Sequence, residues 1–232
     1  MIRANDSFDW FYFNGRCSDE FNTIIKNLTV FSRPERNAQR VSVAGRDGDL
    51  TVSDDTYGTI PAAISCLWEK DMPIDLINEW LSGKGDLIVS YKPDRLYKAE
   101  ISGVIDFINL GDYLQADVMM TVQPFDYEAT PQIIELATSQ TIYHPGTRWS
   151  LPKITVYGEG TLTIGDYTLE ITATGGEDHV VIDSEIGECY YDSENRGGKV
   201  SGEFPKLDPG EISVTIGAGI TAVEIQGNWR WF

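Results

Sequence analysis

Two histidines are the residues best suited to acid–base or nucleophilic chemistry in this sequence. His144 lies in a Tyr-His-Pro-Gly segment, and His179 follows an acidic stretch. Neither belongs to a zinc-binding HExxH motif, and no serine occupies the GxSxG pattern of hydrolases. A triad or a glycosidase-like carboxylate pair assembled only in space remains an alternative. We assign no catalytic residue and predict that the protein is not an enzyme.

Clustered acids are the next candidates, because carboxylate oxygens are the ligands that calcium prefers. The clusters are Asp54-Asp55, Glu177-Asp178-His179 and Asp192-Ser193-Glu194-Asn195. None of them matches the twelve-residue calcium loop that ends in a bidentate acid. Solvated acidic turns are the favoured interpretation, and we predict no metal and no cofactor.

A cluster of arginines is the third chemical feature. Arg33, Arg36, Arg40 and Arg46 lie within a short segment of a chain whose formal net charge is -18. Such a cluster, with the adjacent Asp47, could pair with carboxylates of a neighbouring subunit. The alternative is that these arginines are solvated or pair within the chain.

Charge and composition exclude several classes of protein. The 36 acids and 18 bases are divided so that each half of the chain is equally acidic, which disfavours binding to phosphate backbones. No apolar run is long enough to span a membrane, and the first residues lack the features of a signal peptide. The three cysteines are far apart and are predicted to be buried free thiols of a protein made in a reducing cytoplasm.

The first half of the chain is predicted to be a sheet with one helix. An aromatic run, Phe8–Phe13, precedes Asn14-Gly15, which is typical of a tight hairpin turn. Gln39–Val43 alternates and predicts a short, half-buried strand that closes on a reversal at Gly45–Leu50. A helix is predicted from Asp71, as its cap, through Pro73 in the first turn to a stop at Gly83.

Two long strands complete this half. They are predicted at Tyr97–Asn109 and Tyr113–Val122, after a turn at Lys92–Asp94. Pro124-Phe125 should end the domain. The polar segment Asp126–Pro131 then predicts a boundary between domains 1–129 and 130–232.

The second half reads as a series of short strands. A loop is predicted at Tyr143–Pro152, and from Lys153 onward short alternating segments are separated by glycine-rich turns. This spacing is typical of a β-sandwich, so the fold class is predicted to be mainly β, with an α+β N-terminal domain.

Several short motifs, which occur in a fixed order along both halves of the chain, resemble those of a known protein family. The segment Glu35–Leu50 contains an ER…V.GR.G.L pattern, FYFNG occurs near the start, and P.I.VYG.GTLTIGDYT and KVSGEFPKLDPGE occur later. This set resembles the distal tail (Dit) proteins of siphophages, phages with long non-contractile tails. The resemblance covers nearly the whole length.

The resemblance implies a structural protein of the phage tail tip, made in the host cytoplasm. It implies a hexameric ring of N-terminal domains that joins the tail tube to the tip or baseplate and passes DNA without specific binding. It implies a galectin-like C-terminal domain that projects outward and offers a docking site for receptor-binding proteins, and no membrane partner. Together with the arginine cluster, the resemblance predicts a subunit interface formed by Arg33, Arg36, Arg40, Arg46 and Asp47.

A galectin-like sandwich also suggests an alternative, a carbohydrate-binding module for attachment to the host cell wall. Sugar sites use an exposed aromatic platform with polar partners, and Trp149 beside Arg148 is the candidate pair. Trp229 and Trp231 alternate along one strand, so they share a face and are predicted to be buried.

Overall fold

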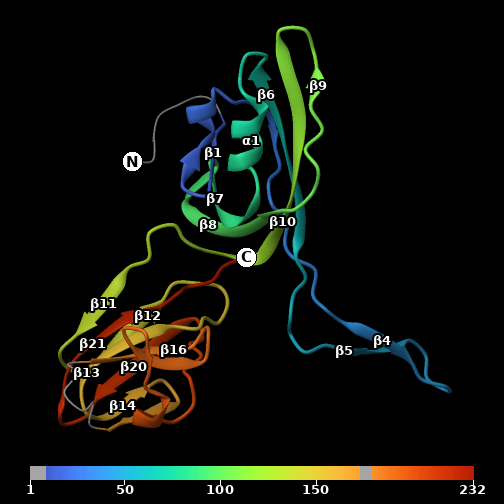
Figure 1. The fold of residues 1–232 in the computed structure, drawn as a ribbon. Coiled ribbons are helices and arrows are strands. Elements are labelled where there is room, and N and C mark those ends of the chain that lie inside the picture. Colours follow the sequence, from blue (N-terminus) through green and yellow to red (C-terminus); the bar gives the residue numbers. More distant parts are fainter. Residues whose placement is uncertain (1–8, 173–178) are drawn as a thin grey trace. The chain divides into compact units, whose positions relative to one another are not determined.

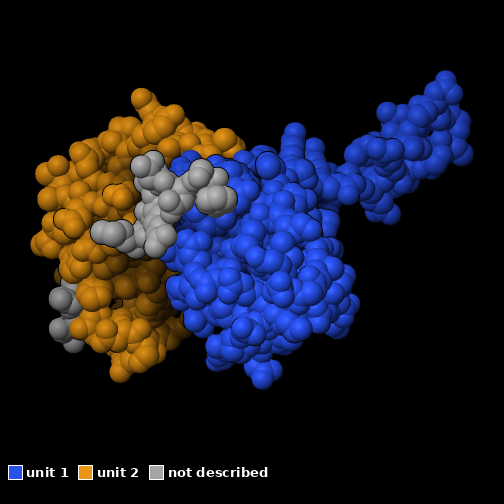
Figure 2. Space-filling model, turned by 90° about the horizontal axis from the view of Figure 1, so that it is seen from above, with its two compact units in different colours: residues 1–129, 232 blue, residues 130–231 orange. Residues whose placement is uncertain are grey.

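The computed structural model describes residues 9–172 and 179–232, and it is mainly β, as the sequence predicts. The chain forms two compact units. Unit 1 comprises residues 1–129 with Phe232, and unit 2 comprises residues 130–231 (Figure 2). Each unit has its own hydrophobic core, and each is described separately below.

Unit 1 is built on an eight-stranded antiparallel sheet (Figure 1). The strands follow the order β2-β1-β7-β8-β10-β6-β3, and β9 pairs with β10. Their bounds are β1 (Phe11–Phe13), β2 (Arg16–Cys17), β3 (Ile24–Leu28), β6 (Ile60–Glu69), β7 (Gly83–Val89), β8 (Lys92–Ile101), β9 (Ile108–Asn109) and β10 (Tyr113–Glu128).

The predicted turn at Asn14-Gly15 is present. Both residues have positive φ, at 50° and 76°, and Phe13 pairs with Arg16 across the turn. A short 3₁₀ helix, η1 (Ser18–Phe21), follows β2. The Asn14 amide packs against β7, where a Cβ on Gly85 would lie 1.8 Å from its Oδ1 atom. A side chain at position 85 would therefore displace the Asn14 amide from this position.

The single predicted helix is also present, as α1 (Ile74–Trp80), but its start was assigned wrongly. Pro73, in an extended conformation, is the N-cap, and no side chain caps the helix. Asp71 therefore lies before the cap and does not fill it. Trp80 fixes the helix to the sheet, since its Nε1 donates to the Phe13 carbonyl at 2.9 Å and its ring stacks on Phe11 and Phe21.

Three predictions about the long strands were wrong. The reversal lies at Ser90-Tyr91, so Lys92–Asp94 begins β8, and β8 ends at Ile101 instead of Asn109. Strand β10 continues past Pro124-Phe125 to Glu128. Its register against β8 shifts between Val122 and Asp126, and this irregularity accommodates a proline that cannot donate a ladder hydrogen bond.

A separate two-stranded hairpin extends from unit 1 (Figure 1). It consists of β4 (Gln39–Ser42) and β5 (Asp49–Val52), and we call residues 39–52 the arm. Gly45 and Gly48 adopt positive φ in the predicted reversal. The prediction that this strand is half-buried was wrong, because every residue of the arm is exposed. Alternation reports an apolar face but does not say whether the same chain covers it.

Unit 2 consists of a six-stranded and a five-stranded antiparallel sheet around one core. The six-stranded sheet contains β11 (Ile133–Leu136), β21 (Ile220–Gln226), β13 (Lys153–Gly158), β16 (His179–Asp183), β17 (Glu188–Tyr191) and β18 (Glu194–Asn195). The five-stranded sheet contains β12 (Gln140–His144), β20 (Gly210–Ile216), β14 (Gly160–Ile164), β15 (Tyr167–Ile171) and β19 (Val200–Ser201). A 3₁₀ turn, η2 (Gly197–Lys199), precedes β19.

The predicted succession of short strands is therefore found, with one correction. Tyr143 and His144 end strand β12 and pair with β20, so the predicted loop begins later than Tyr143. The likeness to a galectin remains a prediction.

Candidate functional site

The arm has two chemically different faces. Val41 pairs directly with Leu50, and Val52 pairs with Gln39, so these side chains share one face. Arg40 pairs with Thr51 on the opposite face. The side chains of Val41, Leu50 and Val52 are 38%, 42% and 52% exposed, and Val43 continues the alternation. The apolar face of the arm is thus left uncovered by its own unit.

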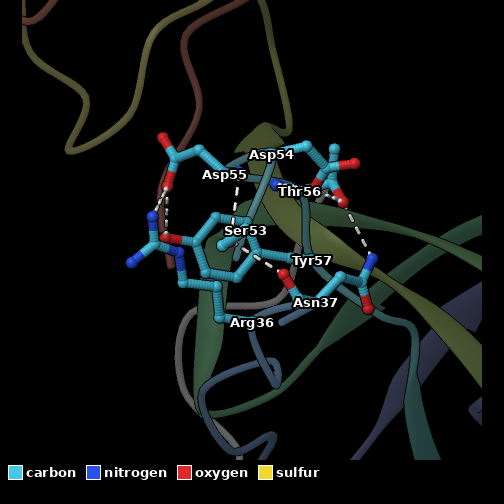
Figure 3. A network of polar contacts seen from close by, with 7 residues as sticks. All are labelled: Arg36, Asn37, Ser53, Asp54, Asp55, Thr56 and Tyr57. Atoms are coloured by element: carbon cyan, nitrogen blue, oxygen red, sulfur yellow. Dashed lines mark hydrogen bonds and ion pairs between the residues drawn. The ribbon is translucent and has the colours of Figure 1, made fainter. Parts of the chain in front are cut away.

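A polar network holds the base of the arm (Figure 3). The Asn37 amide donates to Thr56 Oγ1 at 2.9 Å, and the Ser53 hydroxyl donates to the Asn37 carbonyl at 2.8 Å. Asp54 Oδ1 accepts both the Thr56 hydroxyl at 2.7 Å and the Thr56 backbone N–H at 3.1 Å. The two chain segments that enter and leave the arm are therefore joined to each other.

We call this network, formed by residues 36–37 and 53–57, the clamp. An ion pair also contributes to it. The Arg36 guanidinium lies 3.4 Å from Asp55 Oδ1, and the Tyr57 hydroxyl lies 3.5 Å from the same oxygen. The hydrogen bonds from Thr56 hold the pKa of Asp54 below its usual value, because they stabilise the charged carboxylate. The Asp54-Asp55 pair considered for calcium therefore serves as an acceptor for neighbouring hydrogen bonds.

The predicted interface residues separate into two groups. Arg36 pairs within the chain, and the Arg33 guanidinium lies 5.2 Å from the centre of the Phe232 ring, which also belongs to unit 1. Arg40, Arg46 and Asp47 are exposed on the arm. Among the described residues, no salt bridge involves Arg40 or Arg46. These two arginines are thus the members of the cluster available to a second molecule.

Sequence reasoning missed a second surface, on the outer side of the unit 1 sheet. Alternate residues of β10 are buried, and between them Tyr113 and Met119 point outward, 40% and 54% exposed. Ile24 on β3 and Ile108 on β9 are also exposed, at 49% and 56%. The signal was the presence of apolar residues at both phases of the β10 alternation, since a solvated face is normally polar.

No protein-family model matches the sequence, and no curated protein matches it. A search of solved structures does find a match, to the crystal structure of the SPP1 Dit protein, described as a paradigm of the hub adsorption apparatus in phages that infect Gram-positive bacteria. The superposition has a TM-score of 0.76 at 11% identity and covers 97% of this chain and 100% of that one. The chain is Dit-like in fold.

In this Dit-like chain, the candidate sugar platform already has neighbours. The half-buried Trp149 ring has Lys206 Nζ at 4.1 Å and the Arg230 guanidinium at 4.7 Å from its centre. Arg148 pairs with Arg230 through an isolated backbone bridge. Trp229 is buried as predicted, whereas Trp231 is only half-buried. A sugar contact at Arg148 and Trp149 stays a prediction.

The two histidines are parts of the unit 2 fold. His144 is buried, its Nδ1 accepts the Gly146 N–H at 2.9 Å, and burial lowers its pKa. The His179 ring lies between those of Tyr157 and Tyr191, at 5.3 and 4.9 Å. The structure thus gives each histidine a packing role, and the prediction that no residue is catalytic stands as a prediction.

The structure describes most of the remaining candidate metal ligands and all three cysteines. Within residues 9–172 and 179–232, no three His, Cys, Asp or Glu side chains converge on a metal site. Glu177 and Asp178 lie outside the described residues. All three cysteines are free and buried as predicted, and burial raises the pKa of the Cys66 thiol to about 12. No helix in the described part of the Dit-like chain could cross a bilayer.

Proposed function

We propose that this protein is a structural subunit of a siphophage tail tip, which forms a hexameric ring between the tail tube and the tip or baseplate. The observation that carries the proposal is the Dit-like fold, which extends over 97% of the chain. Six is the number implied by the family resemblance.

The arm supports the proposed ring because it would contact a different surface on the neighbouring copy, and not another arm. A patch that meets a different patch on the next copy generates a closed ring when the rotation closes. On a chain of net charge -18, the exposed Arg40 and Arg46 also give each copy two cationic side chains with which acidic groups of a neighbour can pair, beside Asp47 and Asp49, which leave the arm with no net charge. Repeated weak contacts around the ring then add up.

The proposed partners are other copies of the chain, the tail tube protein, a tail-tip protein and, on unit 2, a receptor-binding protein. DNA would pass through the ring without specific binding, because an acidic wall repels phosphates. The proposed location is the tail tip of the virion, after synthesis in the host cytoplasm.

Light scattering from micromolar to hundreds of micromolar, with negative-stain images of the same sample, tests the ring. We expect a particle of about six times the 25.9 kDa chain mass, with a central hole. The Arg40→Glu/Arg46→Glu variant should weaken assembly at least tenfold while keeping the thermal transition of the native protein. The Lys84→Glu/Lys199→Glu variant is the matched control, since it makes the same charge change away from the arm. Equal assembly of both variants would remove the arm from the interface.

The carbohydrate-binding alternative has less support, because the Trp149 ring that would stack on a sugar already faces two cations. Titration of cell-wall glycans against the native protein and Trp149→Ala tests it. Saturable binding that the substitution abolishes would establish this second role.

A further inference from the structure

The sheets of unit 2 end differently at their two sides. On one side the edge strands β18 and β19 have only two residues each. On the other side the five-stranded sheet ends in β12, which has five residues and, within the described part of the chain, pairs with β20 alone. An edge strand presents unpaired backbone N–H and C=O groups to any chain that lies beside it. Strand β12 therefore has room for a further strand on its open side.

The register of β20 shows which backbone groups of β12 point to the open side. The Ser213 carbonyl accepts the Gly165 N–H at 2.9 Å, so odd-numbered residues of β20 direct their backbone groups towards β14, and even-numbered residues direct theirs towards β12. Ile142 pairs with an even-numbered residue and so bonds to β20. Thr141 and Tyr143 then direct their N–H and C=O groups to the open side. Within the described residues, no hydrogen bond reaches these four groups.

Strand β12 also lacks the features that usually protect an edge strand. Its sequence, Gln-Thr-Ile-Tyr-His, contains no lysine, arginine, acid or proline, and its register against β20 is continuous over all five residues. Protected edges carry charges, prolines or bulges, or they are very short. The Tyr143 side chain is 66% exposed, so its ring is open to a neighbour on an added strand.

We propose that β12 accepts an extended segment of a second tail protein as an added strand of the five-stranded sheet. In this mode of recognition, main-chain hydrogen bonds supply affinity and side chains at alternate positions supply specificity. The inference rests on the proposed tail role, in which unit 2 binds a partner, and it deepens that role by naming the strand and the mode of binding.

Charge indicates the chemistry of the added segment. Glu211 lies directly opposite Tyr143 on β20, and with Asp166 and Asp208 it lines a hollow whose lining also includes Lys206. An added strand would lie two strand spacings, about 9.6 Å, from β20. Lysine or arginine side chains placed beside Tyr143 could extend across β12 towards Glu211. We therefore expect a segment that alternates β-branched residues with lysine or arginine.

The same charges argue against a second copy of the chain as the occupant. Residues 130–232 contain 15 acids and 6 bases, so two copies of unit 2 repel each other. Pairing of β12 with β12 of another copy would also be two-fold and would join only two copies, whereas a ring needs a contact that continues. A segment of a different, locally basic protein meets neither obstacle.

Selection from a library of displayed peptides of about twelve residues, carried out on the native protein, tests the edge. Thr141→Pro removes an outward N–H without removing a bond to β20, and proline is tolerated at such edge positions. Thr141→Ser is the matched control, because it keeps the amide. We expect the enriched peptides to show the alternating basic pattern and to bind Thr141→Pro at least tenfold more weakly than Thr141→Ser.

Backbone readouts separate strand addition from a contact made by side chains alone. With a synthetic copy of the best peptide bound, amide exchange measured by NMR should slow at least tenfold more at Thr141 and Tyr143 than at Ile142, whose N–H already bonds to β20. Two versions of the peptide are then methylated on alternate backbone nitrogens. The version that blocks the N–H groups facing β12 should bind at least tenfold more weakly than the other.

Each outcome supports or overturns the inference. Equal binding to Thr141→Pro and Thr141→Ser overturns it, as does equal binding of the two methylated peptides or a selection that enriches no peptide. The methylated pair is measured on the native protein, so it decides the question even where Thr141→Pro lowers the thermal transition. Oligomer mass that is lost in Thr141→Pro and kept in Thr141→Ser would assign the edge to a second copy and also overturn the inference.

The ring is judged separately, by the mass of the native protein without peptide. A native protein that forms the ring and binds no peptide overturns the edge site and leaves the proposed function standing. A native protein that stays monomeric and binds the peptide through β12 supports the edge site and counts against the ring for this chain alone.

Discussion

Two hairpins of this protein share a local pattern and differ in their surroundings. The arm joins β4 and β5 by a glycine-rich reversal, and β14 and β15 are joined through Gly165-Asp166. In each hairpin apolar and polar residues alternate. Leu162 and Ile164 are completely buried in the sandwich core, whereas Leu50 on the arm is 42% exposed.

The difference shows that alternation specifies an apolar face and leaves open which molecule covers it. The β14–β15 face is covered by the other sheet of unit 2, so it contributes to folding. The face of the arm is uncovered, and an isolated two-stranded hairpin is only marginally stable in water. We infer that one hairpin serves the fold and the other serves assembly.

Hydrogen exchange should give the largest contrast between the hairpins. At concentrations where the protein is monomeric, amides of β14 and β15 should exchange roughly a thousandfold more slowly than those of the arm, because they open only with the core. Mass spectrometry of peptic fragments measures both in one sample. Similar protection of the two hairpins would mean that the arm is stabilised within its own chain.

Truncation of one side chain in each hairpin tests the same difference through the free energy of unfolding. Ile164→Ala should lower the free energy of unfolding of unit 2 by about 2–4 kcal/mol, since it leaves a cavity in a packed core. Leu50→Ala should change the stability of the monomer by less than about 0.5 kcal/mol. Denaturant titration followed by circular dichroism measures both. A large loss from Leu50→Ala in the monomer would contradict the assembly role of the arm.

The pH dependence of unit 2 should follow His144. Burial lowers its pKa, so the folded state favours the neutral ring. Its stabilising contribution is complete above the unfolded value of about 6.5, and it declines as the pH falls below that value towards the lower folded pKa. Thermal melts between pH 8 and 5 should show a shallower decline for His144→Gln than for the native protein.

His179→Gln is the matched control for this experiment, because it removes the other histidine of unit 2. Identical slopes for the native protein and His144→Gln would show that another group causes the pH dependence.

The smallest expected effect concerns the clamp at the base of the arm. Asp54→Ala removes the acceptor of two hydrogen bonds from Thr56, so trypsin should cleave after Arg40 or Arg46 several times faster. Because the pKa of Asp54 is lowered, the clamp should hold above pH 4 and weaken as the pH falls through the folded pKa. Asp166→Ala, at an exposed turn of unit 2, should leave the cleavage rate unchanged. Faster cleavage in that control would exclude a local effect.

Elements with a strong local signal were predictable from the sequence. The Asn14-Gly15 turn, the helix around Ile77 and Trp80, and the short strands of unit 2 depend on turn chemistry and periodicity, which act over a few residues. Boundaries were less predictable. Pro124 suggested an end to β10, but a register shift lets the strand continue and place the buried Asp126 in an ion pair with Lys92.

The candidate site was predictable only in part, because it depends on relations between distant segments. The arginine cluster was visible in the sequence, yet its division into Arg36, which pairs with Asp55, and the free Arg40 and Arg46 required the structure. The exposed Ile24 and Ile108 lie far apart in the sequence, and only the pairing of β3, β6, β10 and β9 brings them onto one row.

The short strands at one side of unit 2 affect how closely packed copies of the protein can contact each other. Both sheets end there in two-residue strands, β18 and β19, so little unpaired backbone is offered to another sheet. Short edge strands are a common protection against edge-to-edge aggregation. If several copies are held close together, this side of each sandwich can meet its neighbours without its strands pairing into a continuous sheet.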